Sequence, residues 1–240
     1  MNEPLVVLGC VHLGFKYADI EYAKEYMKWG KDHGAKFLIL SDMFECALPH
    51  KGKGMIFNQI LDPQEQLEAG MELLRPIKDD IIGYCSGNHS NRAYEVAGID
   101  FDRTVAKELG LLRRYYPQHG LISHKVGTIQ YKIAFTHGVD CGVDYFRNSR
   151  KLLRMYPTAD ICASSHNHVC ATTKEAFFDV DGGGHKIHEV TFVSTGSNLN
   201  YPSYAGKALY PPQPKGYAVL WLGNTTKQVK ADVSGIVGAI

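Results

Sequence analysis

The sequence predicts an α/β fold, because strand-like runs alternate with helical patterns through its first half. Seven apolar runs have the length of a β-strand, and they begin at Leu5, Lys36, Ile81, Tyr131, Ala159, Val190 and Tyr217. Helical spacing of apolar residues separates the early runs, which is typical of strands that pair in parallel through crossover helices. The chain has 240 residues, 45% of them hydrophobic, so we expect one domain that spans residues 1–240.

Four helices are expected from three-and-four spacing of apolar residues, each with a proline or glycine near one end. They cover residues 18–33, 63–77, about 100–109 and 145–155. The second half is richer in hairpins, and residues 175–195 predict two strands joined by a turn at Gly182, Gly183 and Gly184. The proline-rich residues 201–216 predict an irregular surface loop.

The charges of the chain almost cancel, with 26 basic and 25 acidic residues. A broad surface that holds nucleic acid by charge alone is therefore not expected, although a local basic groove stays open. The sequence contains no run of about 18 apolar residues, so no membrane span is predicted. The N-terminus lacks the pattern of a secretion signal. The six cysteines form no Cys-x-x-Cys pair, which indicates free thiols in a reducing compartment and hence a cytoplasmic protein.

Five predicted strands end in residues that can bind a metal ion. The ends are Cys10-Val11-His12, Ser41-Asp42, Gly87-Asn88-His89, Thr136-His137-Gly138 and His166-Asn167-His168. Functional groups in open α/β sheets gather at the carboxyl ends of strands. Imidazole, carboxylate, carboxamide and thiolate ligands suit zinc, manganese or iron, whereas calcium would want more carboxylates. Because His166 and His168 are two residues apart, an extended backbone would point both imidazoles the same way, and the same holds for Cys10 and His12.

The order of these motifs resembles the calcineurin-like metallophosphoesterase family. That family has an Asp-x-His, a Gly-Asp-x-x-Asp/Glu, a Gly-Asn-His-Glu/Asp, a Thr-His-Gly and a Gly-His-x-His motif, and the resemblance covers residues 8–168. It implies a four-layer α/β/β/α sandwich of two mixed sheets flanked by helices. The Asn-Arg pair after Gly-Asn-His and the Tyr/Pro-rich segment before the last strand also resemble small family members often carried by bacteriophages.

The resemblance implies seven ligands for two divalent ions of manganese, zinc, iron or nickel. The first ion would be held by Cys10, His12 and His168, the second by Asn88, His137 and His166, and Asp42 would bridge the two. In this family, such ions clamp a phosphate and activate a hydroxide that attacks phosphorus.

The same resemblance implies roles for four residues around the two ions. His89 would donate a proton to the leaving group or stabilise developing charge, and Arg92 would contact the phosphate. A plain surface cation is the alternative for Arg92. Glu45 would orient a ligand or its loop. Gly87 would permit a tight turn.

Cys10 stands where the family has an aspartate, and this is the largest departure from its pattern. A thiolate favours zinc or iron over magnesium and cannot offer a second oxygen. A small buried hydrophobic residue is the alternative reading of Cys10. Serines replace three further family residues, at Ser41, Ser90 and Ser165.

Residues outside the motifs are expected to have structural roles. Cys85 and Cys162 should lie in the core, and Cys141 should pack near the site. Solvated or turn positions are expected for His33, His50, His119, His124, His185 and His188. Tyr201, Tyr204 and Tyr210 could stack on a base, although a surface loop rich in tyrosine does not require this.

The sequence therefore predicts a metal-dependent phosphoric ester hydrolase, with a phosphodiester of a nucleotide or nucleic acid as the favoured substrate. One alternative is a phosphomonoesterase of the same fold. Another is a catalytically weakened metal-binding module, in which Cys10 has disabled the first metal site. The oligomeric state stays open.

Overall fold

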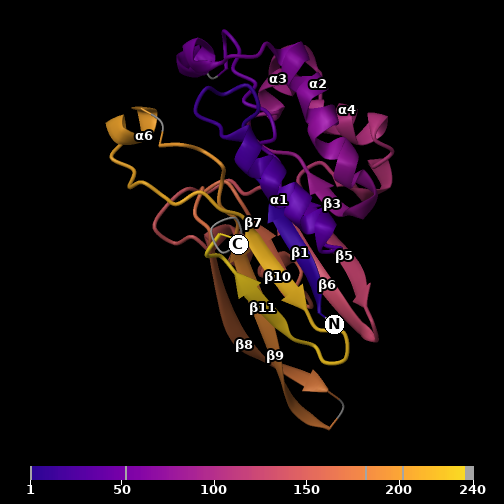
Figure 1. The fold of residues 1–240 in the computed structure, drawn as a ribbon. Coiled ribbons are helices and arrows are strands. Elements are labelled where there is room, and N and C mark those ends of the chain that lie inside the picture. Colours follow the sequence, from indigo (N-terminus) through magenta and orange to yellow (C-terminus); the bar gives the residue numbers. More distant parts are fainter. Residues whose placement is uncertain (1, 52, 182, 202, 236–240) are drawn as a thin grey trace.

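The computed structural model describes residues 2–51, 53–181, 183–201 and 203–235, which form two mixed β-sheets with helices on their outer faces (Figure 1). The strands of the first sheet are, in spatial order, β11 (Val229–Asp232), β10 (Ala218–Leu222), β1 (Glu3–Leu8), β2 (Lys36–Ile39), β3 (Ile81–Cys85) and β4 (Tyr115–Tyr116). Those of the second sheet are β5 (His119–Val126), β6 (Ile129–Thr136), β7 (Ile161–Ser164), β9 (Gly184–Ser194) and β8 (Ala171–Asp181).

The α-helices are α1 (Ile20–Asp32), α2 (Pro63–Leu74), α3 (Asn91–Ala97), α4 (Phe101–Glu108), α5 (Arg147–Met155) and α6 (Ser203–Lys207). Short 3-10 helices are η1 (Lys53–Asn58), η2 (Arg75–Asp80) and η3 (Leu112–Arg114). No helix in the described part of the chain is both long and apolar enough to cross a membrane.

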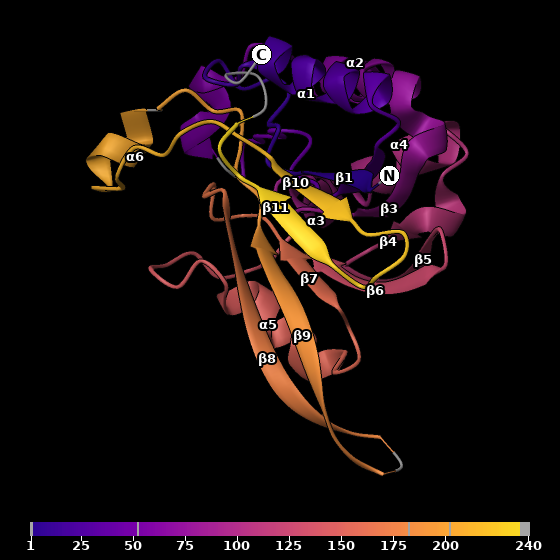
Figure 2. The same cartoon turned by 60° about the horizontal axis from the view of Figure 1, so that its bottom comes forward.

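Alternating side chains on the strands build the predicted four layers. Val6 and Leu8 of β1 pack on the side of helices α1, α2 and α4, whereas Leu5 and Val7 pack toward the second sheet. Leu152 of α5 closes the opposite face of the second sheet. Figure 2 shows α1, α2 and α4 on one side of the molecule and α5 on the other. The predicted α/β/β/α sandwich is confirmed.

The first three strands pair in parallel, β1 with β2 and β2 with β3, and α1 and α2 form the crossovers. All four expected helices are present, but the second was predicted too long, because α2 ends at Leu74 and the chain continues as a 3-10 helix. Pro76 explains this end, since its ring clashes with the preceding turn and it lacks a backbone donor. The short helices α3 and α6 were not predicted.

The predicted hairpin in the second half is also present. Strands β8 and β9 pair antiparallel from Ala171 opposite Ser194 to Asp181 opposite Gly184. The pair projects beyond the body of the protein (Figures 1 and 2). Of the predicted turn, Gly182 lies outside the described residues.

Candidate metal centre

Five loops meet at the carboxyl ends of β1, β2 and β3 in the first sheet and of β6 and β7 in the second. Backbone hydrogen bonds tie them together: the amide of Cys10 donates to the carbonyl of Ser41 at 2.7 Å, and that of His12 donates to the carbonyl of Asp42 at 2.9 Å. The polar strand ends found in the sequence therefore converge, although they come from two sheets.

The backbone of these loops is unusual. Eight described non-glycine residues have positive φ, and six of them carry or flank the site: Cys10 (53°), His12 (52°), Ser41 (24°), Asp42 (47°), His166 (74°) and His168 (57°). Left-handed backbone costs an L-residue about 1–2 kcal/mol, and such strain gathers at functional sites. We expected extended backbone at Cys10 and His12 and at His166 and His168. This expectation is wrong, because all four residues have left-handed backbone after their strands have ended.

With this backbone, the side chains of His166 and His168 point in different directions. Nε2 of His168 lies 3.2 Å from Nε2 of His12, whereas Nδ1 of His166 lies 3.1 Å from Nε2 of His137. The thiol of Cys10 joins the first pair, and ligand atoms of Cys10, His12 and His168 lie within 4.8 Å of one another. These are the three residues expected for the first ion.

The second group of ligand atoms surrounds His137. Its Nε2 lies 2.9 Å from Oδ1 of Asn88, 3.0 Å from Oδ2 of Asp42 and 3.1 Å from Nδ1 of His166. Separations near 3 Å are those expected between ligands that share one ion, because each metal–nitrogen or metal–oxygen bond is about 2.0–2.2 Å long. The residues expected for the second ion thus lie together.

The hydrogen bonds of the two buried histidines test whether a cation fits. Nδ1 of His137 faces the carbonyl of Leu40 at 2.9 Å, and Nδ1 of His12 faces Oε2 of Glu45 at 3.1 Å. Since these oxygens only accept, both Nδ1 atoms donate, which leaves each Nε2 as the atom that can bind a cation. Burial opposes the shift, but Asp42 outweighs it and raises the pKa of His137, so a cation bound there must displace the proton that Nε2 carries in the charged ring. A proton on Nε2 of His137 could form a hydrogen bond to one of the three neighbouring acceptors, whereas a cation could bind all three. Metal-binding histidines typically have such a donor bond from the far nitrogen, so the residues fit divalent ions.

Asp42 lies between the two groups. Its Oδ2 is 3.0 Å from Nε2 of His137, and its Oδ1 accepts the backbone amide of His89 at 2.8 Å. Ligand atoms of Cys10, Asp42 and His137 also lie within 4.8 Å of one another. Burial raises the pKa of Asp42, but the positive field of His137 and His89 outweighs it and holds the pKa well below its usual value. The carboxylate is therefore charged at neutral pH.

Burial sets the protonation of the remaining ligands. It lowers the pKa of His12, lowers that of His166 to about 4 and lowers that of His168 well below its usual value. These imidazoles are neutral at pH 7 and can accept a metal ion without losing a proton. Burial and the charge of Asp42 raise the pKa of the Cys10 thiol, so metal binding at Cys10 must displace its proton.

Glu45 and Arg92 lie behind the ligands. Oε2 of Glu45 is 3.1 Å from Nδ1 of His12 and 3.2 Å from Nδ1 of His89. Nη1 of Arg92 donates to the Glu45 carbonyl at 2.8 Å and to Oε1 at 3.3 Å. Arg92 is not among the described residues that line the cavity beside the centre, so in this structure it holds Glu45 rather than reaching toward a substrate.

Gly87 has a different role from the one expected. A Cβ atom at this position would lie 2.0 Å from Oδ1 of Asp42 and 2.3 Å from its backbone nitrogen. Gly87 is also absent from the described glycines with positive φ. The expected turn does follow Gly87, whose carbonyl accepts the Asn91 amide at 3.3 Å, but it requires no positive φ at Gly87; the missing side chain instead leaves room for Asp42.

Asp102, which sequence reasoning missed, supports the same loops. It is fully buried and accepts hydrogen bonds from the hydroxyls of Ser41 at 2.7 Å and Tyr84 at 2.6 Å, and from the Gly87 amide at 3.4 Å. Burial raises its pKa from 3.8 to about 6, although these donors oppose the shift. An aspartate in the first turn of a helix is common, so nothing in the sequence indicated this role.

The pKa of Asp102 predicts how Asp102→Asn changes stability with pH. The raised folded-state pKa means that this carboxyl stabilises the fold most below about pH 4 and loses that contribution as pH rises through 6. Asparagine does not titrate, so the variant does not lose stability in this way as pH rises. Its unfolding free energy should therefore rise relative to that of the wild type by up to about 3 kcal/mol between pH 4 and 7. Urea unfolding of both chelator-treated proteins measures the difference, and a difference that is flat with pH would contradict the shift.

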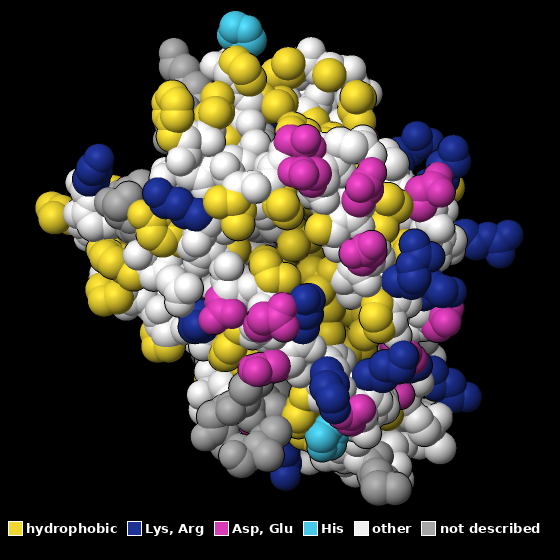
Figure 3. Space-filling view, turned by 45° about the horizontal axis from the view of Figure 1, so that its top comes forward, with side chains coloured by type: hydrophobic (Ala, Val, Ile, Leu, Met, Phe, Trp, Pro, Cys, Tyr) yellow, Lys and Arg dark blue, Asp and Glu magenta, His cyan; other side chains and the backbone are white. Residues whose placement is uncertain are grey.

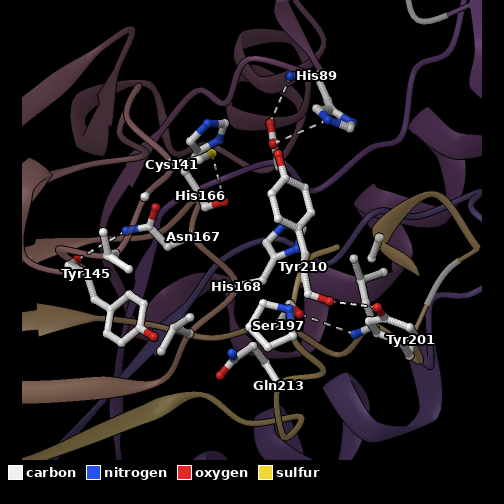
Figure 4. Close-up of a pocket in the computed structure, with 17 residues that line it drawn as sticks. His89, Cys141, Tyr145, His166, Asn167, His168, Ser197, Tyr201, Tyr210 and Gln213 are labelled. Atoms are coloured by element: carbon white, nitrogen blue, oxygen red, sulfur yellow. Dashed lines mark hydrogen bonds and ion pairs between the residues drawn. The ribbon is translucent and has the colours of Figure 1, made fainter. Parts of the chain in front are cut away.

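A cavity of about 470 Å³ opens from the centre (Figure 4). Asp42, His89, His166 and His168 line part of it, and Tyr201 and Tyr210 are among the other lining residues. The side chain of Tyr204 lies outside the described part of the chain. Cys141 is exposed and lines the cavity, so the expectation that it packs is wrong.

The other structural expectations hold in part. Cys85 and Cys162 are buried as predicted. His33, His50 and His185 are exposed as predicted. The remaining three histidines outside the motifs are partly buried, and each has a polar partner: Tyr156 for His119, Glu3 for His124 and Asp160 for His188.

Comparisons with known proteins bear on the fold. No protein-family model and no curated sequence matches the chain. A predicted phosphoesterase from Streptococcus pneumoniae TIGR4 has 15% identity and a TM-score of 0.46, over 97% of this chain and 90% of that one. Vacuolar Protein Sorting 29 from Cryptosporidium parvum has 12% identity and a TM-score of 0.47, over 98% of both chains.

Another similar structure is Vps29 from Entamoeba histolytica, solved in complex with zinc, with 11% identity and a TM-score of 0.44 over 96% of this chain and 98% of that one. At such identities and scores the similarity concerns the course of the backbone. The chemistry of this chain has to follow from its own side chains.

Proposed function

We propose that the protein is a metal-dependent phosphoesterase that hydrolyses a phosphodiester. One observation carries the proposal: two groups of metal-binding atoms meet at Asp42, at the end of a cavity that also contains His89. An isolated metal site inside a core would need no such cavity. A phosphate held over the two groups would have room for its organic substituent.

Each part of the site supports a separate task. Divalent ions bound there would polarise phosphoryl oxygens and lower the pKa of a water molecule. Glu45 and the carbonyl of Leu40 fix the His12 and His137 rings with Nε2 toward the centre. His89 is partly exposed beside the cavity and can donate a proton to the leaving oxygen.

The charge of the cavity favours a diester over a monoester. Of the described residues that line it, none is Lys or Arg. A phosphomonoester carries up to two negative charges near pH 7, against one for a diester. Without a basic side chain in the described lining, the second charge would have to be met by the ions alone.

The test compares bis-p-nitrophenyl phosphate with p-nitrophenyl phosphate, using chelator-treated protein loaded with manganese, zinc, nickel or magnesium. Turnover of the diester with at least one metal, and its loss on chelation, is the expected result. Preference for the monoester would overturn the diester assignment. Absence of turnover with every metal would overturn the enzymatic function.

Replacing His89 by Asn should slow hydrolysis in a way that depends on the leaving group. An alkoxide needs a proton as it departs, whereas p-nitrophenolate leaves without one, so the loss should approach about 100-fold for methyl esters. It should stay within about tenfold for nitrophenyl esters. Steady-state rates on both ester types measure this, and equal losses on both would contradict proton donation by His89.

A binding module that holds metal without turnover is the second candidate, and the thiol at Cys10 is the observation in its favour. If the protein is an enzyme, Cys10→Asp should keep or raise activity with manganese, because it restores an oxygen ligand, and should weaken zinc binding. Activity assays and metal titrations measure the two effects. A folded Cys10→Asp protein without activity would show that the thiolate itself is required.

A further inference from the structure

The cavity is larger than the phosphate group that the proposed function requires. Its volume of about 470 Å³ lies within the range of sites that enclose a whole small molecule. The candidate ligands Asp42, His166 and His168, together with His89, line only part of it. The remaining space must therefore receive an organic group of the substrate.

Aromatic and aliphatic side chains dominate that remaining space. Tyr145, Tyr201 and Tyr210 surround it (Figure 4), together with Leu199 and Val169. The hydroxyl of Tyr201 donates to the carbonyl of Tyr210 at 2.6 Å, which fixes the two tyrosines relative to each other. Tyr201 is 48% exposed and Tyr210 is 57% exposed. Exposed aromatic faces around a cavity are suited to stacking on a flat ring.

The described lining offers nothing to a second phosphate. Its only carboxylate is Asp42, and it contains no Lys or Arg. A nucleic-acid strand is held by contacts of basic residues with successive phosphates. On the face drawn in Figure 3, basic side chains are interspersed with acidic ones and form no single patch. The group that enters the cavity is therefore neutral.

Two amides add polar recognition to the aromatic walls. Asn167 lies between His166 and His168, and its Nδ2 donates to the carbonyl of Tyr145 at 3.2 Å. Its Oδ1 is buried and has no hydrogen-bond partner within the described residues. Gln213 lies at the same cavity. A buried acceptor without a donor costs free energy, so a turn of the Asn167 side chain that brings Oδ1 to a ligand N–H or amino group would be favourable.

We infer that the substrate is a phosphodiester with one neutral aromatic substituent that carries a hydrogen-bond donor and is up to the size of a nucleoside. This inference rests on the proposed phosphodiesterase function and narrows its substrate class. Both a nucleobase and another amino-substituted arene have this chemistry. A polynucleotide does not fit.

The test uses four diesters that share p-nitrophenolate as the leaving group and differ in the second ester: methyl, cyclohexyl, phenyl, and the 5′-ester of adenosine. Each carries one negative charge, so differences in kcat/KM report on the cavity. The phenyl ester should exceed the methyl and cyclohexyl esters by about tenfold, as expected for one stacked ring. The adenosine ester should equal or exceed the phenyl ester, because it adds the donor.

Variants connect the preference to the cavity. Tyr210→Ala should reduce the ratio of phenyl to methyl kcat/KM at least fivefold, and Tyr210→Phe should retain it. Tyr94→Ala is the matched control, because Tyr94 is 58% exposed and lies on α3 outside the cavity lining. Equal kcat/KM for all four esters, or a ratio untouched by Tyr210→Ala, would overturn the inference and leave the phosphodiesterase standing. No turnover of any diester would overturn both.

Discussion

Replacing Asp42 by Asn should abolish metal-dependent turnover while leaving the fold intact, with a loss of more than about 100-fold. Even indirect support of a metal ligand is worth up to about 100-fold, and Asp42 faces both groups of ligand atoms directly. The asparagine oxygen can still accept the His89 amide, which Oδ1 now does at 2.8 Å. What disappears is a negative charge that would offset divalent cations bound there.

The measurements for Asp42→Asn are kcat/KM, bound metal per chain and the melting temperature of the chelator-treated protein. We expect metal content to fall with activity and the chelator-treated protein to stay folded. Asp79→Asn is the matched control, because the Asp79 side chain is exposed and forms its ion pair with neighbouring Lys78. Normal turnover in Asp42→Asn would rule out a shared carboxylate ligand.

The sequence predicted the convergence of the ligands because two rules of the fold do not depend on side-chain detail. Parallel strands deliver their carboxyl ends to one edge, and β1, β2 and β3 pair in that way. The residue types at those ends limit the chemistry. Neither rule requires knowledge of how the turns are shaped.

The shape of the turns is where sequence reasoning failed. Nothing in Cys10-Val11-His12 or His166-Asn167-His168 marks a left-handed backbone, because cysteine and histidine rarely adopt it without tertiary support. That support comes from bonds across the chain, such as the Cys10 amide to the Ser41 carbonyl. Asp102 was missed for the same reason, since its partners Ser41 and Tyr84 lie far away in sequence.

Among glycine-to-alanine exchanges near the candidate metal centre, Gly87→Ala should be the most disruptive. The new Cβ would lie 2.0 Å from Oδ1 of Asp42 and 2.3 Å from its backbone nitrogen, so either the Gly87 loop or Asp42 must move. Asp42 already has strained backbone, with φ of 47°, and its carbonyl accepts the His12 amide at 2.9 Å. Overpacking of this kind costs about 1–3 kcal/mol, which lowers the melting temperature of a chain this size by roughly 2–12 °C.

The metal dependence of that loss separates a damaged site from a merely destabilised fold. Bound metal stabilises the folded wild type by mass action, so its melting temperature should rise on metal addition. In Gly87→Ala the displaced Asp42 should remove most of this rise, and the difference from wild type should be larger with metal than with chelator. Gly183→Ala is the control, because a Cβ there meets no atom within 4 Å. An undiminished metal-induced rise in Gly87→Ala would mean that the position of Asp42 does not govern metal binding.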